Sequence, residues 1–378
     1  MKWKFYSLAF VAGMSILTAC SSDDNNDNDG NGGNGNGNEI ENGTILKGTI
    51  TSDVTLAAGN TYKLSGEYIV EEGGTLHIEE GVKIIAVYDD IADYILVKQG
   101  GKINAVGTPD KPIVMTSEKE EPGAWGGIHI CGRAHTNAEG GKGSSEIGGA
   151  VYGGNDDADN SGTLQYIRLE YTGFAFDEEH EANGISFYSV GNGTIVDHCQ
   201  AYKGSDDGFE FFGGSVNVSN LVAVSCSDDS FDWTEGWNGK GTNLVAYQEA
   251  ESTLGYDCDC LMECDNNGSN NAATPVAHPV LKNLILVGNG GSKQGIRLRA
   301  GTEVEIDNAK VCGKGQPLTV ETALTENALK NGTSKLTNIT LTSELSCKEG
   351  IYTHADFIAV TSNKVDANLS YSSFEDIK

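Results

Sequence analysis

Two short acidic segments in the middle of the chain carry residue types that could do chemistry. Residues 206–211 (DDGFEF) match residues 228–233 (DDSFDW) at an offset of 22 residues. If one offset is one turn of a repeating β structure, equivalent carboxylates lie one strand spacing apart, about 4.8 Å. Carboxylates that close repel each other, so they bind a cation, share a proton or turn into water.

Three interpretations of these acids remain open. A calcium ion needs six to eight oxygen ligands, to which Asp206, Asp207, Asp228 and Asp229 could contribute. A glycoside hydrolase would use two carboxyls, about 5 Å apart if retaining and about 6.5–9.5 Å apart if inverting. In the third interpretation the carboxylates only accept hydrogen bonds from turn backbone. The same four aspartates are therefore both the candidate metal ligands and the candidate catalytic residues.

The strand after each acidic pair adds candidate binding residues. Alternation along a strand predicts that Glu210 and Asp232 face away from Phe209 and Phe231. Trp233 supplies a flat ring that could stack on a sugar. The predicted ligand-binding set is Asp206, Asp207, Glu210, Asp228, Asp229, Asp232, Trp233, Arg297 and Arg299.

Two families of polysaccharide-degrading enzymes offer a comparison. Asp206-Asp207 resembles the aspartate pair of polygalacturonases, and residues 297–299 (RLR) loosely resemble their Arg-x-Lys motif. However, no histidine lies between two glycines, as the polygalacturonase pattern requires. Pectate lyases bind calcium through acids on stacked coils and use an arginine as base, a role that Arg297 or Arg299 would match. Plain surface charge on one strand face also explains that arginine pair. The missing histidine motif favours a protein that binds and does not cleave.

Other residues suggest weaker candidates. Phe174 and Phe176 lie in an acid-rich loop and are expected to be the most exposed of the aromatic residues that could bind sugars. The others are Trp125, Trp233, Trp237 and Tyr171. The acidic segment 155–160 (NDDADN) fits a cation site and a solvated turn equally well.

The cysteines are expected to form disulfides. Eight remain apart from Cys20, an even number, and an exported protein meets an oxidising environment. The spacing C-x-C-x3-C at 258–264 lacks the C-x2-C pairs of zinc ribbons. The expected partner for this group is Cys226 or Cys199, and Cys312 is expected to pair with Cys347.

A repeat must position all of these residues. Fifty glycines, six prolines and short β-branched runs are typical of an all-β chain. From about residue 160 onward the units share one form: an alternating apolar strand, then a polar Asn, Asp or His, then another short strand. Spacings in the twenties predict a solenoid whose coils stack into a parallel β-helix. A pair of β-sandwiches is the alternative. We also expect a short helix over 320–330, stopped by Gly332, and a helical turn at 354–360 near the C-terminal cap.

The N-terminus predicts export and lipid attachment. Residues 1–19 have a basic start and an apolar stretch too short to span a membrane. Residues 17–20 (LTAC) resemble the lipobox of bacterial lipoproteins, which implies that Cys20 becomes the acylated, palmitate-carrying N-terminus. Residues 20–43 should form a disordered acidic tether, and 44–378 a single β-helix domain. The SSDD start of the tether resembles the signal that exports lipoproteins of Bacteroidetes to the cell surface.

Several longer strings resemble one protein family. They are LHIEEGVKI from Leu76, WGGIHICG from Trp125, YGGNDDADNSGTLQYIRLEYTG from Tyr152 and SDDGFEFFGG from Ser205. They look like right-handed parallel β-helix surface lipoproteins of Bacteroidetes, which implies architecture and an outer-membrane location but little about activity.

Charge narrows the partners. A net charge of −29 argues against nucleic acid and fits calcium or cationic ligands. We therefore expect a lipid-anchored, surface-exposed protein that binds a glycan or host polymer, with Ca²⁺ as the candidate ion. The alternatives are a polysaccharide lyase or hydrolase acting through the stacked acids, and a structural surface protein.

Overall fold

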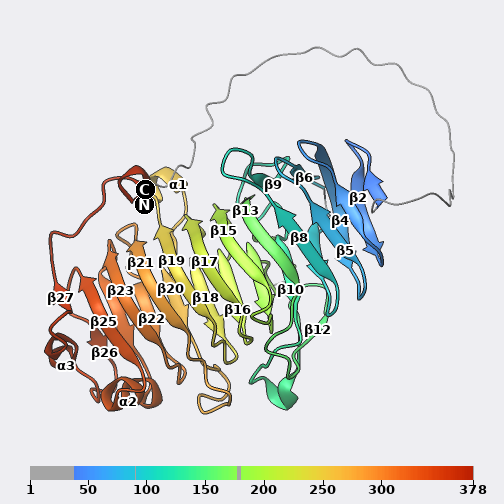
Figure 1. Ribbon diagram of the computed structural model, residues 1–378. Helices are drawn as coiled ribbons and strands as arrows, with labels where there is room; N and C mark the ends of the chain where they lie inside the picture. The colour runs from blue at the N-terminus through green and yellow to red at the C-terminus, as the bar shows by residue number, and fades with distance from the viewer. Residues whose placement is uncertain (1–37, 90, 177–179, 378) are drawn as a thin grey trace, which may run out of the picture.

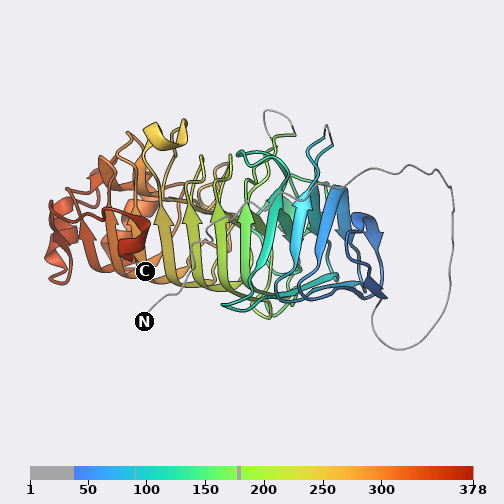
Figure 2. The ribbon, with the colours of Figure 1, turned by 90° about the horizontal axis from the view of Figure 1, so that it is seen from above.

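The protein is an elongated stack of β-coils. The computed structural model describes residues 38–89, 91–176 and 180–377, and the coils follow one another in chain order along the long axis (Figures 1 and 2). Nearly all strands pair in parallel with the equivalent strand of the next coil, within one sheet system of 25 strands. This confirms the predicted parallel β-helix. The signal segment, Cys20 and most of the predicted tether lie outside the described residues.

One strand of each coil builds the face that carries the candidate residues, here called the site sheet. Its strands are β7 (Tyr94–Val97), β10 (Ile128–Cys131), β14 (Ile185–Tyr188), β16 (Phe209–Phe212), β18 (Phe231–Thr234), β20 (Met262–Cys264), β22 (Gln294–Leu298), β24 (Gln316–Val320) and β26 (Ser346–Cys347). The 22-residue alignment seen in the sequence is confirmed, because Phe209 pairs with Phe231 and Glu210 with Asp232. The same register continues one coil earlier, where Ile185 pairs with Phe209.

A longer, bent strand closes the rest of each later coil. The bent strands are β13 (Gly162–Glu170), β15 (Ile195–Tyr202), β17 (Asn217–Val224), β19 (Lys240–Tyr247), β21 (Val280–Val287), β23 (Glu305–Cys312) and β25 (Lys335–Leu341). The first coils use β1 (Asn38–Ile40), β2 (Ile45–Ile50), β3 (Val54–Leu56), β4 (Thr61–Val70), β5 (Thr75–Ile78), β6 (Lys83–Ala86), β8 (Lys102–Val106) and β9 (Ile113–Ser117).

An asparagine in left-handed conformation makes each late bend. The bend residues of β17, β19, β21, β23 and β25 are asparagines with φ between 55° and 63°. Asn243 Nδ2 donates to Asn220 Oδ1 at 2.8 Å, and Asn283 Nδ2 donates to Asn243 Oδ1 at 2.9 Å. Asparagine tolerates this conformation better than other residues with a β-carbon, and its amide bonds the next coil. The strand–polar–strand unit of the sequence is this bend.

The bend gives a first testable prediction. Asn243→Ala should destabilise the protein by about 2–3 kcal/mol, because it loses two ladder hydrogen bonds and puts an alanine in the left-handed region. Asn243→Gly loses the same bonds without the backbone strain, so its cost should be about 1 kcal/mol smaller. Urea unfolding of both variants measures the difference. Equal costs would show that backbone conformation does not select asparagine here.

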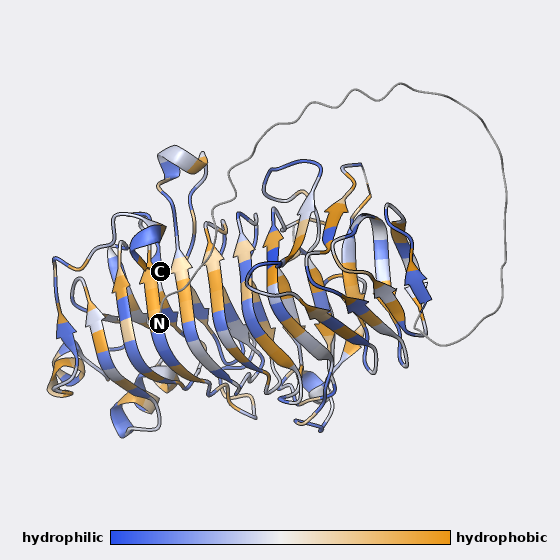
Figure 3. Ribbon diagram, turned by 45° about the horizontal axis from the view of Figure 1, so that its top comes forward, coloured by the Kyte–Doolittle hydropathy of each residue, from blue (hydrophilic) through white to orange (hydrophobic). Residues whose placement is uncertain are grey.

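Stacked apolar side chains fill the interior. Figure 3 shows hydrophobic stretches along the strands of successive coils. The rings of Phe187 and Phe211 stack at 5.0 Å, and those of Phe209 and Phe231 at 5.6 Å, both nearly parallel. Trp237 stacks on Phe211 at 4.2 Å. These aromatic ladders therefore form the core of the middle coils.

The two ends differ from the central coils. The β-helix begins earlier than the sequence predicted, since β1 pairs with β3 and the Tyr62 hydroxyl donates to the Ile40 carbonyl at 3.1 Å. Near the other end lie α2 (Ala323–Asn331), stopped at Gly332 in left-handed conformation, and α3 (His354–Ala359). Both helices were predicted. β27 (Lys364–Val365) ends the stack, and η2 (Phe374–Ile377) returns to β19, where Phe374 contacts Tyr247.

The disulfide prediction is wrong for the described part of the chain. All eight cysteines described there are free. Bridging neighbouring coils would require cysteines at equivalent positions, but Cys264 pairs with Trp233 and Leu298 in register. Cys312 lies on β23 and Cys347 on β26, which belong to different faces. Most of these thiols are buried and pack as small apolar side chains.

None of the helices in the described ranges is long and apolar enough to span a membrane. The short helix α1 (Glu251–Leu254) sits in a turn, η1 (Glu139–Gly141) in a loop, and β11 (Gly143–Ser144) pairs with β12 (Val151–Tyr152) as a small hairpin.

Candidate functional site

The predicted acids come together on the outer side of the site sheet. Asp206 and Asp207 lie in the turn before β16, and Asp228 and Asp229 in the equivalent turn before β18. Glu210 pairs with Asp232 in register, and both point outward while their neighbours Phe209 and Phe231 point into the core. These six acids are called the acidic face below.

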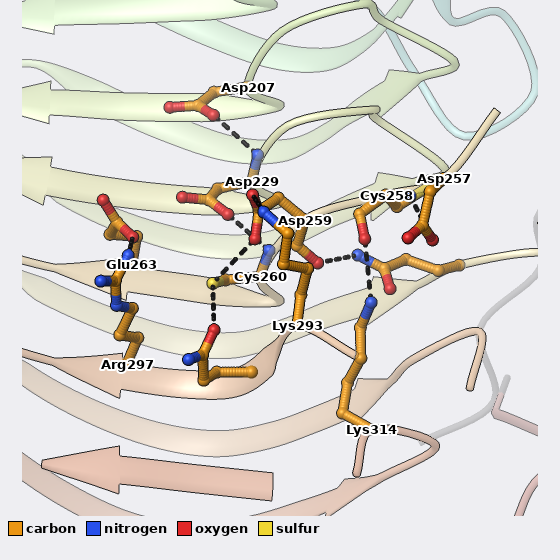
Figure 4. A network of polar contacts seen from close by, with 12 residues as sticks. Asp207, Asp229, Asp257, Cys258, Asp259, Cys260, Glu263, Lys293, Arg297 and Lys314 are labelled. Carbon is orange, nitrogen blue, oxygen red and sulfur yellow. Dashed lines mark hydrogen bonds and ion pairs between the residues drawn. The ribbon is translucent and has the colours of Figure 1, made fainter. Parts of the chain in front are cut away.

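Part of this arrangement is structural. Asp207 Oδ1 accepts a hydrogen bond from the Asp229 N–H at 2.8 Å, and Asp229 Oδ1 accepts one from the Cys260 N–H at 2.6 Å (Figure 4). Each carboxylate therefore ties its turn to the next coil. Asp207 and Asp229 each use one carboxylate oxygen in this way. The interpretation that the acids accept hydrogen bonds from turn backbone therefore holds for one of the two oxygens of each of these residues.

The carboxylates also form overlapping groups suited to a cation. Ligand atoms of Asp207, Glu210 and Asp232 lie within 4.8 Å of one another, and so do those of Asp229, Asp232 and Glu263. A third such group consists of Asp206, Asp207 and Asp228. Oxygen-only donors at this spacing suit a hard cation such as Ca²⁺.

Ionisation of the six carboxyl groups is unfavourable when no cation is bound. Burial, with the charge of Asp228 next, raises the pKa of Asp206 to about 7, and burial raises that of Asp228 to about 6. Burial and the neighbouring carboxylates raise the pKa values of Asp207, Glu210, Asp229 and Asp232 well above the usual range. The acidic face therefore holds protons or a bound cation near neutral pH.

Two buried oxygens at the acidic face have no hydrogen-bond partner in the described part of the chain. They are Asp232 Oδ1 and Asn183 Oδ1. The other end of the Asn183 amide donates to Glu210 Oε2 at 2.6 Å, so this side chain lies against the acids. The sequence analysis did not select Asn183 as a site residue. Its position is the signal that could have identified it, because Asn183 precedes β14 as Asp207 precedes β16.

The two predicted arginines form ion pairs with acids of the neighbouring coils. Arg297 Nη1 pairs with Glu263 at 2.8 Å, and Arg299 Nε pairs with Asp265 at 2.7 Å. Arg297 also contacts Glu321 at 3.2 Å. The arginine pair was predicted as part of the site, and Arg299 is near enough to lower the pKa of Asp232. Both arginines are nevertheless held by Glu263 on β20 and by Asp265 and Glu321, which directly follow β20 and β24, and not by the six acids of the acidic face.

A loop covers the start of the site sheet. Residues 132–161, called the flap, pack Ile147, Ala150 and Tyr152 against Tyr188 and Phe212 on the outer side of the sheet. The base of the flap is held by the acidic segment at 155–160, where Asp157 Oδ1 contacts His135 Nδ1 at 2.6 Å and Asp159 Oδ2 accepts from the Arg133 N–H at 3.1 Å. In this segment the carboxylates serve the fold of the flap.

The flap brings one acid that sequence reasoning missed. Glu146 accepts a hydrogen bond from the Tyr188 hydroxyl at 3.3 Å, and burial of its carboxyl group raises the pKa to about 7. Its charge raises the pKa of both Glu210 and Asp206. No repeat marks Glu146, and only the packing of the flap places it opposite the acidic face.

The aromatic candidates divide into core and surface. Trp233 was predicted to bind ligand, but it is 1% exposed, and its indole N–H donates to Thr302 Oγ1 at 3.1 Å. Trp125 and Trp237 are equally buried. These predictions are wrong: alternation along β18 turns the Trp233 ring into the β-helix, and Trp125 and Trp237, outside the strands, also pack into the core. Phe176 is 38% exposed, as expected, with its ring 5.9 Å from that of Tyr94.

The fold and the acidic face define a parallel β-helix protein whose polar side chains gather on the outer side of one sheet. Residues 48–377 match the model of the pectate-lyase-like β-helix domain, and the chain belongs to that family. A polysaccharide-related function is compatible with this domain. Comparison with curated proteins and with solved structures gave no significant match.

Proposed function

We propose that the protein binds a polysaccharide at its acidic face while a lipid on Cys20 holds it to the outer surface of the cell. The observation that carries the binding site is the set of six clustered acids without a lysine or arginine salt bridge among the described residues. A face of this kind is costly to maintain, and the protein's elongated shape presents it to a polymer. The lipobox-like sequence before Cys20 supports the anchor.

Calcium is the cation that best fits the inner acids. Asp207, Glu210, Asp229 and Asp232 supply carboxylate oxygens, and the unpartnered Oδ1 of Asn183 supplies an amide oxygen. Bound Ca²⁺ would neutralise the acids and orient hydroxyl or carboxylate groups of the glycan. The residues therefore fit the ion in donor type.

Cleavage of the polysaccharide is the second candidate. Asp206 and Asp228, whose pKa values are raised to about 7 and about 6, could exchange a proton near neutral pH. Against it, both arginines near the site are engaged in ion pairs and neither is free to act as the base. We therefore place binding first.

Calcium titration tests the cation site. Asp232→Asn should weaken Ca²⁺ binding about tenfold or more in calorimetry, because Asp232 belongs to two of the three-acid groups and affinity follows the number of charged ligands. The control Asp307→Asn removes an acid from β23 and should bind Ca²⁺ as the parent does. An absence of binding heat in the parent would remove the calcium proposal.

The same preparations decide between binding and cleavage. A panel of glycans is incubated with the protein, and both retention and new reducing ends are measured. Retention without new ends supports the proposal. New reducing ends that disappear in Asp207→Asn would replace binding with catalysis as the function.

A further inference from the structure

A lysine is buried where the turns of two neighbouring coils meet. Lys314 lies in the turn between β23 and β24 and is 4% exposed. Its side chain runs across Gly288, in the turn that follows β21, so closely that a β-carbon added to the glycine would lie 2.5 Å from Lys314 Cγ. The glycine therefore leaves the room through which the lysine reaches the turn of the preceding coil.

The amino group of Lys314 is bonded to neutral oxygens and forms no salt bridge with any described residue. Nζ donates to the Cys258 carbonyl at 2.9 Å (Figure 4) and to Asn289 Oδ1 at 3.0 Å. Burial lowers the pKa of Lys314, because the charged form loses its hydration. The neutral amine that burial favours is a nucleophile.

The side-chain amide of Asn289 is held at both ends beside this amine. Its Oδ1 accepts hydrogen bonds from Lys314 Nζ at 3.0 Å and from the Gly291 N–H at 3.2 Å. Its Nδ2 donates to Asp257 Oδ1 at 3.0 Å. The Gly291 N–H can stabilise negative charge on Oδ1, and the Asp257 carboxylate can relay a proton to Nδ2. A nucleophile, a polarised carbonyl group and a proton relay are therefore connected by direct hydrogen bonds.

We propose that Lys314 and Asn289 form an intramolecular amide bond that ties the two coils together covalently. Nζ of the neutral amine adds to Cγ of Asn289, and one of its protons passes by way of the Asp257 carboxylate to Nδ2. The Cγ–Nδ2 bond then breaks, ammonia leaves, and a Cγ–Nζ amide bond remains. One amide is exchanged for another, so the reaction needs no oxidant and no cofactor. The hydrogen bonds already hold the reacting groups together, which removes most of the entropic cost of the addition.

The bond supports the coils next to the acidic face. The eight cysteines of the described ranges are free, so this cross-link gives the stack a covalent tie that disulfides do not supply there. It closes a loop of about 25 residues and thereby lowers the conformational entropy of the unfolded chain. Lys314 also holds the Cys258 carbonyl, in the segment that leads to Cys260, and the Cys260 N–H donates to Asp229 of the acidic face.

Peptide mapping of the full chain tests the proposal. The purified protein is denatured and digested, and its peptides are sequenced by tandem mass spectrometry. We expect a branched peptide that joins the segments around Asn289 and Lys314, with a mass about 17 Da below their sum because ammonia has left. Trypsin should no longer cut after Lys314. Two linear peptides without any branched product, with Asn289 either intact or deamidated, would overturn the proposal.

Matched variants identify the role of each group. Lys314→Arg should abolish the branched peptide, whereas Lys310→Arg, on the neighbouring β23, should leave it unchanged. Asp257→Asn should slow the growth of the linked fraction after synthesis at least about a hundredfold, because it removes the proton relay. Asp307→Asn should leave that rate as in the parent, and an equal rate in Asp257→Asn would overturn the proposed reaction. The parent protein alone decides whether the bond forms, so a variant that fails to fold leaves the test intact.

Discussion

Without divalent cations, the melting temperature of the protein is expected to fall as the pH rises from about 5 to about 7.5. The carboxyls of the acidic face have pKa values raised above those of an unfolded chain, with Asp206 at about 7 and Asp228 at about 6. Such groups stabilise the fold fully below the unfolded pKa of about 4, and this contribution disappears as the pH passes the folded pKa. Most proteins with ion-paired acids behave in the opposite way over acidic pH.

The expected size follows from the shifts. One pKa unit corresponds to about 1.4 kcal/mol. After allowance for solvent screening, the titrating acids should together cost roughly 3 kcal/mol, or about 5 °C in melting temperature. The buried His129, whose pKa is lowered to about 4, acts in the opposite direction as a single group. Asp93 and Glu146, both raised to about 7 by burial, add to the fall.

Thermal unfolding in buffers with chelator, followed by circular dichroism, measures this fall. Asp232→Asn should flatten the slope because it removes one of the mutually repelling charges. Asp307→Asn should leave the slope unchanged, since hydrogen bonds from Asn338 and Thr337 lower the pKa of that carboxyl. Added Ca²⁺ should restore the melting temperature at pH 7.5. A flat or rising profile in the parent would show that the acidic face is not strained.

A second large effect is expected from Trp233→Ala, which should destabilise the protein by about 3–5 kcal/mol. Trp233 is buried against Trp237, with ring centroids 5.8 Å apart, and its removal leaves a cavity and breaks the bond to Thr302. Phe176→Ala removes a ring that is 38% exposed and should change stability by less than about 1 kcal/mol.

Glycan binding, in contrast to stability, is expected to depend on Phe176 and not on Trp233. Phe176→Ala should weaken retention of a bound glycan severalfold, because an exposed ring can stack on a sugar face. Trp233→Phe keeps the core filled and should bind as the parent does. Urea unfolding and glycan titration on the same samples give both readouts. If the Trp233→Ala variant were stable but had lost glycan binding, Trp233 would have to lie at the surface, which would contradict the structure.

Short-range patterns in the sequence predicted much of this site. The offset between residues 206 and 228 set the pairing of Glu210 with Asp232, since each coil of a β-helix adds one strand spacing. Period-two alternation separated these acids from the core phenylalanines. Asparagine at the bends, and Gly332 after α2, marked the points where left-handed backbone was needed.

Other features depended on contacts that no local pattern records. Alternation along the strand gives the direction of the Trp233 ring. The prediction that this ring stacks on a sugar relied on the residue type alone. Free cysteines were not predictable, because a disulfide requires two Cα atoms about 4.4–6.8 Å apart with side chains that face each other, and the sequence reveals number and spacing only. The start of the β-helix was predicted too late, because residues 20–43 were assigned to the tether although Ile40 packs against the core.

The acidic repeats, the asparagine bends and the strand alternation together determined from sequence the parallel β-helix and the outer face on which the acids lie. Each of these is a short-range pattern repeated coil after coil, so its meaning survives without knowledge of the rest of the chain. Only the tertiary structure decided which acids stay unpaired. Arg297 and Arg299 form ion pairs with Glu263, Asp265 and Glu321, and the flap places Glu146 opposite the acidic face, because coils and loops distant in sequence meet only once the stack has closed.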